Sequence, residues 1–280
     1  MTWTRKGALL LAGIGVGLWT PCLSAAPLKP NRIEIAYVHP SNPAHQHIYE
    51  RLKERRMLER LKGYLSPLRL PKPLLLKTEG CDGESNAWYE ASDGAVTVCY
   101  EYIDEVLRNA PGITTDQGIS PQDAVVGPTI EVFLHEIGHA VFDLLKVPIL
   151  GREEDAADQV AAYLMLQLDE DIARSTVAGV AYMYGHEAQS QNPGLKQFAD
   201  VHGLSAQRFF NLLCMAYGAQ PKLFSDVVDK GYLPESRAEG CADEYKQVDY
   251  AFNRLITPYV DQALRKKVQP KKLLRPDAQR

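Results

Sequence analysis

Residues 130–142 read Ile-Glu-Val-Phe-Leu-His-Glu-Ile-Gly-His-Ala-Val-Phe, an apolar run in which His135, Glu136 and His139 are set. Two histidines four residues apart project from one face of an α-helix, where they can hold one Zn²⁺ ion while a third ligand comes from elsewhere. Glu136 directly follows the first histidine, where a carboxylate can take a proton from a metal-activated water. The alternative is a buried helix with two satisfied histidines, but three polar groups in an apolar stretch need partners. The pattern therefore predicts a zinc-binding helix at the centre of the fold.

A second acidic stretch follows at residues 151–162, Gly-Arg-Glu-Glu-Asp-Ala-Ala-Asp-Gln-Val-Ala-Ala. It predicts a helix on which Glu154 and Asp158 share one face. A glutamate there can complete a tetrahedral zinc site, and an aspartate one turn later can hydrogen-bond the other ring nitrogen of a ligand histidine. For Glu153 and Asp155 we favour simple stabilisation by the helix dipole. We therefore expect Glu154 as the third metal ligand, with Asp158 behind a ligand histidine.

Composition is that of an ordinary soluble globular protein. The 280 residues are 45% hydrophobic and 24% charged, enough for one sizeable core or two small ones. The net charge is −4, but residues 27–264 contain 34 acids against 22 bases, whereas residues 265–280 contain seven bases and one acid. An acidic body argues against nucleic acid as a partner. We expect one domain over residues 31–264 and a flexible basic tail over residues 265–280.

Residues 1–26 have the pattern of a secretory signal peptide. Arg5 and Lys6 form a positive start, residues 7–18 are apolar, and residues 24–26 supply Ser-Ala-Ala for cleavage. An uncleaved membrane anchor is the alternative, but the apolar run is short for a span. No other segment is long and apolar enough, so we expect no stable membrane insertion once the signal is removed. The predicted location is secreted or periplasmic.

Export would place the four cysteines that follow the signal peptide in an oxidising compartment, where an even number of cysteines predicts disulfides. They are Cys81, Cys99, Cys214 and Cys241. Three pairings are possible, and proximity in sequence favours Cys81–Cys99 and Cys214–Cys241, each contributing about 3 kcal/mol by the loop-entropy model. A four-cysteine zinc site is the alternative, which the lack of a C-x-x-C spacing disfavours.

The chain as a whole predicts an α+β fold, mostly helical, with a small mixed sheet. Strands are expected at residues 32–38 and 74–77, and a β-hairpin at residues 87–90 and 95–100 is expected to pack beside the zinc-binding helix. Apolar spacing, caps and breakers predict helices over residues 44–65, 101–109, 127–146, 151–168, 171–188, 205–217, 222–229 and 239–264.

Glycines bear on the zinc-binding helix in two ways. Ser120-Pro121 has the residues of a helix start, but Gly127-Pro128 interrupts the pattern, so we expect the helix proper to begin there. Gly138 lies inside the motif, where it costs about 1 kcal/mol relative to alanine. We interpret Gly138 as permitting the close approach of a neighbouring element.

The two metal-site motifs resemble those of a known class of enzyme. His-Glu-x-x-His followed by Glu-x-x-Ala-Asp is similar to the pattern of the gluzincin metallopeptidases, in which a glutamate on the next helix is the third ligand. Roughly residues 31–260 resemble a bacterial family of exported metallopeptidases that is otherwise classed as a domain of unknown function. The resemblance implies a zincin-like fold and a zinc site. It is supported by residues 98–101, 151–158 and 202–218.

We predict a zinc-dependent metallopeptidase that hydrolyses peptide bonds of a peptide or protein substrate. Zinc bound by the two histidines and the glutamate would keep its fourth position open for water, and Glu136 would be the general base. The oxyanion needs a second electrophile. We favour His202, with His186, Arg208 and Tyr217 as other candidates. An edge of the β-hairpin is a suitable place for an extended peptide.

Two alternative functions keep the same metal. One is a zinc-stabilised envelope protein with a binding or chaperone-like role and no peptidase activity, which the lack of a readable substrate signature motivates. The other is an amidase that acts on cell-wall peptides. A peptide-library digest with and without chelator separates the first alternative from a peptidase. The sequence favours no particular oligomeric state.

Overall fold

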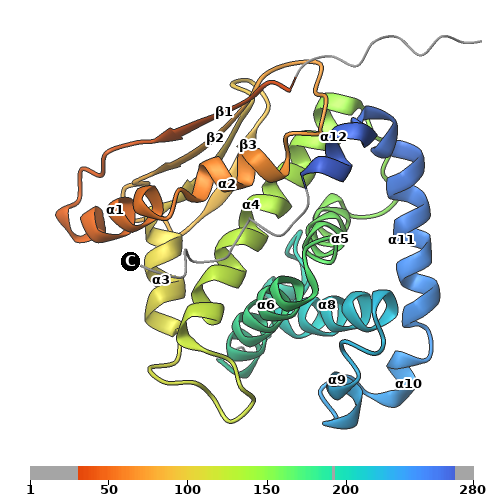
Figure 1. The fold of residues 1–280 in the computed structure, drawn as a ribbon. Helices are drawn as coiled ribbons and strands as arrows, with labels where there is room; N and C mark the ends of the chain where they lie inside the picture. The colour runs from red at the N-terminus through yellow and green to blue at the C-terminus, as the bar shows by residue number, and fades with distance from the viewer. Residues whose placement is uncertain (1–30, 191–192, 269–280) are drawn as a thin grey trace, which may run out of the picture.

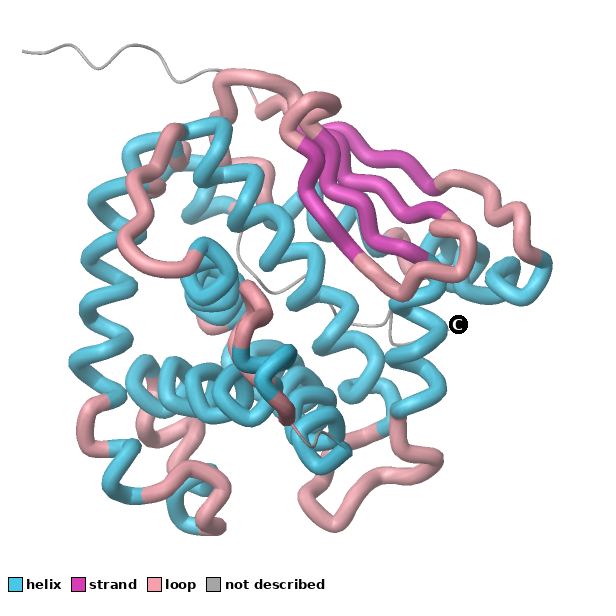
Figure 2. The backbone as a smooth tube through the Cα atoms, turned by 180° about the vertical axis from the view of Figure 1, so that it is seen from behind, coloured by secondary structure: helices cyan, strands magenta, loops and turns pink. Residues whose placement is uncertain are grey.

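The computed structural model describes residues 31–190 and 193–268. The expected signal peptide at residues 1–26 and the basic tail beyond residue 268 lie outside the described residues. Helices dominate the described part of the chain, and one four-stranded sheet lies along an edge of the helical body, as Figures 1 and 2 show. The predicted mostly helical α+β class with a small mixed sheet is therefore confirmed. No helix within these residues combines the length and apolarity of a membrane span.

The sheet has the strand order β1-β2-β4-β3. Neighbours β1–β2 and β2–β4 run parallel, while β3 and β4 form the predicted antiparallel hairpin. Strand β4 is buried along its whole length, which fits its place between two neighbouring strands and against the central helix α4 (Pro121–Leu145). The strands are β1 (Ile33–Tyr37), β2 (Leu74–Glu79), β3 (Ala87–Glu90) and β4 (Ala95–Cys99).

The longer helices form the body of the molecule. The central helix α4 packs against both α5 and α6, and α8 packs against α5, α6 and α11 (Figure 1). The helices of eight or more residues are α1 (Gln46–Glu54), α2 (Met57–Tyr64), α3 (Tyr100–Asn109), α4 (Pro121–Leu145), α5 (Glu153–Met165), α6 (Glu170–Ser190), α8 (Ser205–Ala219) and α11 (Cys241–Leu255). The short ones are η1 (Pro43–His45), α7 (Leu195–Phe198), α9 (Asp226–Asp229), α10 (Glu235–Ala238), η2 (Thr257–Tyr259) and α12 (Gln262–Lys267).

The single helix predicted over residues 44–65 is wrong, because the chain breaks it into α1 and α2. Arg56 adopts a left-handed conformation at the break, with φ of 52°. The hydroxyl of Tyr37, on β1, fills the gap: it accepts the backbone N–H of Leu58 at 2.8 Å and donates to Glu59 at 2.7 Å. A side chain from the sheet thus caps α2, which no local sequence signal reveals.

The central helix is one continuous element through Gly127-Pro128, so the predicted start at residue 127 is wrong. Its true start is capped by Ser120, whose hydroxyl accepts the N–H of Asp123 at 3.1 Å. Pro128 cannot donate a helical hydrogen bond, but α6 packs closely here: a Cβ atom on Gly127 would lie 2.6 Å from the Thr176 carbonyl oxygen. The glycine is needed for this helix contact and does not mark a break.

The C-terminal prediction also needs correction. The helix expected over residues 239–264 divides into α11, η2 and α12, because Pro258 interrupts it and Asp261 caps a new start by accepting the N–H of Leu264 at 3.0 Å. Helix α12 runs to Lys267, beyond the expected beginning of the tail. Of the helix expected over residues 222–229, only the last turn forms, as α9.

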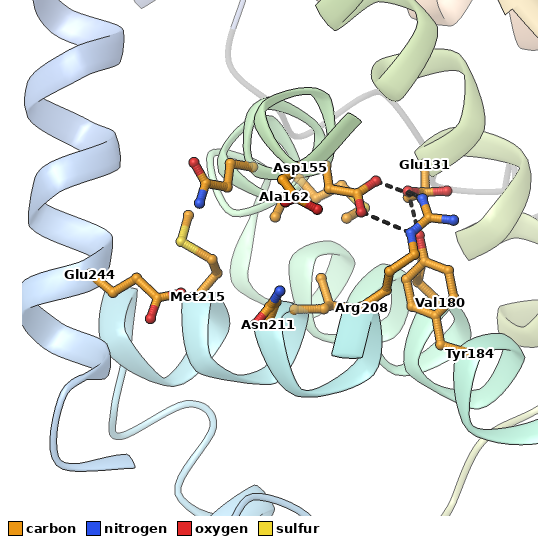
Figure 3. A pocket seen from close by; sticks show the side chains of 13 residues that line it. Glu131, Asp155, Ala162, Val180, Tyr184, Arg208, Asn211, Met215 and Glu244 are labelled. Carbon is orange, nitrogen blue, oxygen red and sulfur yellow. Dashed lines mark hydrogen bonds and ion pairs between the residues drawn. The ribbon is translucent and has the colours of Figure 1, made fainter. Parts of the chain in front are cut away.

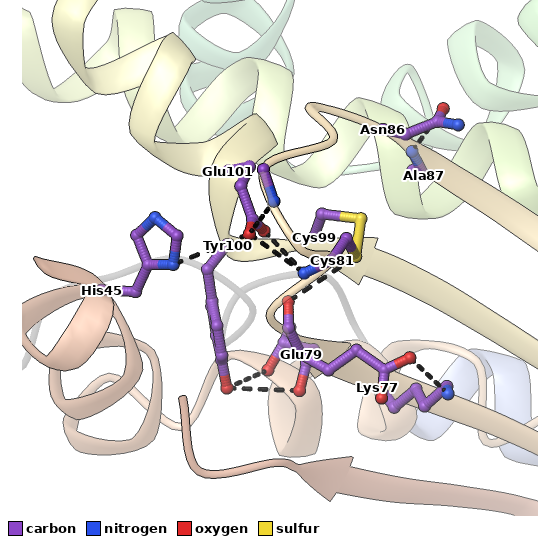
Figure 4. The surroundings of a disulfide bond; sticks show 11 residues. His45, Lys77, Glu79, Cys81, Asn86, Ala87, Cys99, Tyr100 and Glu101 are labelled. Carbon is purple, nitrogen blue, oxygen red and sulfur yellow. Dashed lines mark hydrogen bonds and ion pairs between the residues drawn. A yellow bond between two sulfur atoms is a disulfide. The ribbon is translucent and has the colours of Figure 1, made fainter. Parts of the chain in front are cut away.

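Two disulfides link neighbouring elements, in the pairings that sequence proximity favoured. Cys81–Cys99 joins the loop after β2 to the end of β4, and Cys214–Cys241 joins α8 to α11. Beside the first disulfide, the carboxylate of Glu101 accepts the backbone N–H of Cys81 at 2.9 Å, as Figure 4 shows.

Candidate metal centre

Three side chains from two consecutive helices meet at one point. His135 and His139 project from α4, one turn apart, and Glu154 projects from the first turn of α5. The Nε2 atoms of the two histidines are 3.2 Å apart, and Glu154 Oε2 lies 3.1 Å from the first and 3.2 Å from the second. The structure thus brings together the three residues predicted as metal ligands.

The triangle has the size that a tetrahedral zinc site requires. Ligand atoms about 2.0–2.1 Å from one zinc ion in tetrahedral geometry are about 3.3–3.4 Å from each other. The chemistry of the donors fits as well. Asp158 Oδ1 lies 2.8 Å from His135 Nδ1, and Glu153 Oε1 lies 2.8 Å from His139 Nδ1. An imidazole that donates through Nδ1 can, when neutral, present its Nε2 lone pair to a metal, so two imidazole nitrogens and a carboxylate oxygen can converge on one cation.

Glu153 is a residue that the sequence interpretation missed. Its carboxylate does not only stabilise the start of α5; it also accepts the Nδ1–H of His139, as Asp158 does for His135. Two adjacent acids at a helix start give no sequence signal that separates these roles. The geometry assigns each histidine its own orienting carboxylate.

Glu136 lies beside the triangle. It is buried, 7% exposed, and its Oε1 atom is 4.0 Å from His135 Nε2. Burial raises the pKa of the Glu136 carboxyl above its usual range, against the opposing charges of the nearby histidines. A carboxylate that is close to the predicted ligands without being one of the triangle is suited to hold a proton.

His202 reaches the same point from the turn before α8. Its Nε2 atom is 2.9 Å from Glu154 Oε2, and its ring is stacked on that of His135 with 6.0 Å between centroids. The side chain is 46% exposed, so it stands at the rim of the site. His186, another candidate from the sequence, stacks on Tyr182 instead, beside a different pocket on α3 and α6.

Opposite charges face each other at the triangle. Burial lowers the pKa of His135, but hydrogen bonds to Asp158 and Glu154 outweigh it and raise the pKa to about 10. The hydrogen bond from His135 lowers the pKa of Glu154 to about 2. The carboxylates of Asp158 and Glu154 thus favour positive charge at His135, and a divalent cation would satisfy them in the same way as a proton.

A group of buried polar side chains lies behind the predicted ligands, and the sequence did not predict this group. Arg208, on α8, was expected only as an oxyanion candidate; its guanidinium instead binds Asp158 through two hydrogen bonds, of 2.8 and 2.6 Å. Figure 3 shows the side chain of Arg208 beside those of Glu131 and Tyr184. Its Nη2 atom also lies 3.6 Å from Glu131, which accepts a hydrogen bond of 2.8 Å from Tyr184. The position of Glu131 is a signal for such a role, because it is an acid one turn before His135 in an apolar run and so needs a buried partner.

Two other clusters of potential ligands are explained without a metal. Cys81 and Cys99 lie close to Glu101, but their sulfurs are joined to each other. Glu131 and Asp158 lie close to His135, but Arg208 pairs with both acids. A third cluster joins His202 to His135 and Glu154 and so shares two residues with the triangle. Among the described residues, this one place is therefore the best candidate for a metal.

A helix with H-E-x-x-H that faces a carboxylate from the next helix is the arrangement of zinc-dependent peptidases. The comparison with protein families supports a metallopeptidase without naming the metal: the family model DUF4344, described as "Putative metallopeptidase", matches residues 37–256. The chain belongs to this family, as its motifs indicated. The searches of curated proteins and of solved structures found no match.

Proposed function

We propose that the protein is a zinc-dependent peptidase whose metal is held by His135, His139 and Glu154. The observation that carries the proposal is the convergence of three potential ligand atoms, 3.1–3.2 Å from each other, beside the buried Glu136. The family description supports a metal-dependent peptidase. Zinc is favoured over harder cations because two of the three donors are imidazoles.

A bound zinc ion supplies a Lewis acid, which acidifies water and polarises a carbonyl group. Glu136 accepts the proton of the attacking water and passes it to the leaving amine, because its carboxylate is close to the reacting centre and is shielded from solvent. His202 donates a hydrogen bond to the carbonyl oxygen as negative charge develops there. Asp158 and Glu153 hold the two ligand imidazoles in one tautomer.

The substrate we propose is a peptide or protein outside the cytoplasm. The two disulfides are typical of an oxidising compartment, and the sequence pattern of residues 1–26 indicates export. Strand β3 is the outer strand of the hairpin, at the edge of the sheet that packs on α4. An extended peptide added to such an edge would run beside the zinc-binding helix.

Replacement of the proposed base tests the mechanism. Glu136→Gln keeps the size of the side chain but cannot accept a proton, so we expect full zinc content and loss of cleavage. Zinc is measured by elemental analysis, and cleavage with a fluorogenic peptide library with and without chelator. Glu239→Gln, at an exposed position, is the control and should behave as wild type.

The outcomes separate the candidate functions. Undiminished cleavage by Glu136→Gln would rule out this mechanism. A wild-type protein that binds zinc but cleaves no peptide would support the non-proteolytic envelope protein. Cleavage confined to cell-wall peptides would support the amidase.

A further inference from the structure

Arg208 is a largely buried cation with a partner on each side. Its side chain is 19% exposed, and Nε and Nη2 bind the two oxygens of Asp158. Its Cζ atom lies 4.5 Å from the centroid of the Tyr184 ring, and Nη2 is 3.6 Å from Glu131. A planar guanidinium held in this way fixes the plane of the carboxylate that it binds.

Asp158 is the link between Arg208 and the triangle. Its Oδ1 atom receives hydrogen bonds from both sides: Nη2 of Arg208 at 2.6 Å and Nδ1 of His135 at 2.8 Å. Because Arg208 also occupies Oδ2, the carboxylate can present only Oδ1 to the histidine. The bidentate pair thereby fixes the position of the acceptor, and the acceptor fixes the tautomer and the plane of the His135 ring.

Arg208 also balances two neighbouring negative charges, those of Asp158 and Glu131. Asp158 lies close to a second acid, Glu131, which is only 5% exposed. Nη2 of Arg208 is the positive charge between them, since it lies 2.6 Å from Asp158 and 3.6 Å from Glu131. If Arg208 is removed, the two negative charges repel each other, and no guanidinium holds the Asp158 carboxylate in the plane that faces His135.

Arg208 also connects the site to the segment that carries His202. It lies in the first turn of α8, where its backbone N–H donates to the carbonyl of Leu204 at 2.9 Å. A Cβ atom on Gly203 would lie 3.7 Å from Arg208 Cγ. The arginine therefore joins the start of α8, and with it the turn that bears His202, to α5.

We infer that Arg208 is a positioning residue of the proposed metal centre: its fork on Asp158 orients His135 toward the ion and anchors the segment that bears His202. This inference rests on the proposed function, because it presumes a metal at the triangle. It concerns metal affinity and ligand geometry rather than the chemical step.

The test is the affinity of the full chain for zinc, measured by competition with a chromophoric chelator. Loss of a partner behind a metal-bound histidine typically costs 10–100-fold in affinity, and we expect an increase in zinc Kd of this order for Arg208→Met. Arg208→Lys keeps the charge but not the fork, so its Kd should lie between those of wild type and Arg208→Met. Bound Co²⁺ should show a changed visible absorption spectrum in Arg208→Met.

Arg174→Met is the matched control. Arg174 on α6 also pairs with an acid, Asp226, and also lies over an aromatic ring, that of Phe224 at 5.4 Å, but away from the triangle. Its loss should lower stability and leave zinc Kd unchanged.

The outcomes distinguish this inference from the proposed function. Equal zinc affinity of wild type and Arg208→Met would overturn the inference alone, and so would a parallel loss of affinity in Arg174→Met. If Arg208→Met does not fold, a wild-type Kd in Arg208→Lys would overturn it. A wild-type protein that binds no zinc would overturn both the inference and the proposed function.

Discussion

Gly138 of α4 lies directly against Ala157 of α5. A Cβ atom on Gly138 would be 3.2 Å from Ala157 Cα and 3.4 Å from its Cβ, closer than side chains normally pack. Gly138 directly precedes His139 on α4, and Ala157 lies about one turn after Glu154 on α5, so the contact joins the two helices next to the triangle. The distance between the two helices therefore sets the distance between the predicted ligands.

Gly138→Val should separate α4 from α5 and weaken zinc binding. Overpacking of a tight contact typically costs 1–3 kcal/mol, and we expect a loss of about 2 kcal/mol in the free energy of unfolding together with a higher zinc Kd. Urea unfolding and chelator competition measure the two effects. Gly63→Val in α2 is the control, because a Cβ atom there meets nothing within 4 Å. Wild-type zinc affinity in Gly138→Val would contradict the prediction.

Zinc should stabilise the protein against unfolding, and a chelator should reverse the effect. A ligand that binds only the native state contributes about 2.7 kcal/mol at a concentration of 100 times its Kd. Thermal unfolding of the apo and zinc-loaded protein measures the difference. His139→Ala should abolish the zinc-dependent rise in Tm, whereas His47→Ala, at an exposed position on α1, should retain it. A rise that survives in His139→Ala would place the metal elsewhere.

Glu101 should make stability depend on pH in the acidic range. Burial raises the pKa of its carboxyl, but hydrogen bonds from the backbone N–H groups of Cys81 and Gly83 outweigh it, so the pKa is lowered overall (Figure 4). A carboxyl with a lowered pKa in the folded state stabilises the protein above its unfolded pKa, and this contribution is lost as the pH falls through the folded value.

Glu101→Gln should therefore be less stable than wild type at pH 7, by about 1.5–3 kcal/mol if the charge-assisted hydrogen bonds have typical strength. The difference should shrink as the pH falls below 4. Urea unfolding of both proteins, with disulfides intact, at neutral and acidic pH measures it. A difference that is the same at every pH would show that the charge of Glu101 is not involved.

The fold could be predicted where the signal is local. The alternation in residues 32–38 and the turn between residues 90 and 95 placed β1 and the hairpin, because strand period and turn chemistry are encoded in neighbouring residues. The predictions failed where a distant element decided the outcome. Tyr37 caps α2 from the sheet, and the packing of α6 against Gly127 keeps α4 continuous across a proline.

In the candidate site, too, local patterns could be predicted and contacts from distant elements could not. The spacing of His135, His139 and Glu154 predicted that these residues meet, because a short connection keeps two consecutive helices close together. Arg208 could not be placed, because only the tertiary fold brings α8 beside α5. Nor could the sequence show that the acid behind His139 is Glu153.

The triangle is local in sequence, whereas its support is not. His135, His139 and Glu154 all lie on α4 and the start of α5, but Arg208 and both cysteines of the second disulfide lie beyond α5 in the chain. Two neighbouring helices therefore suffice to bring the three side chains together, and the docking of α8 adds the hydrogen bonds that hold Asp158. A substitution that loosens α8 should accordingly disturb the orientation of His135 without separating α4 from α5.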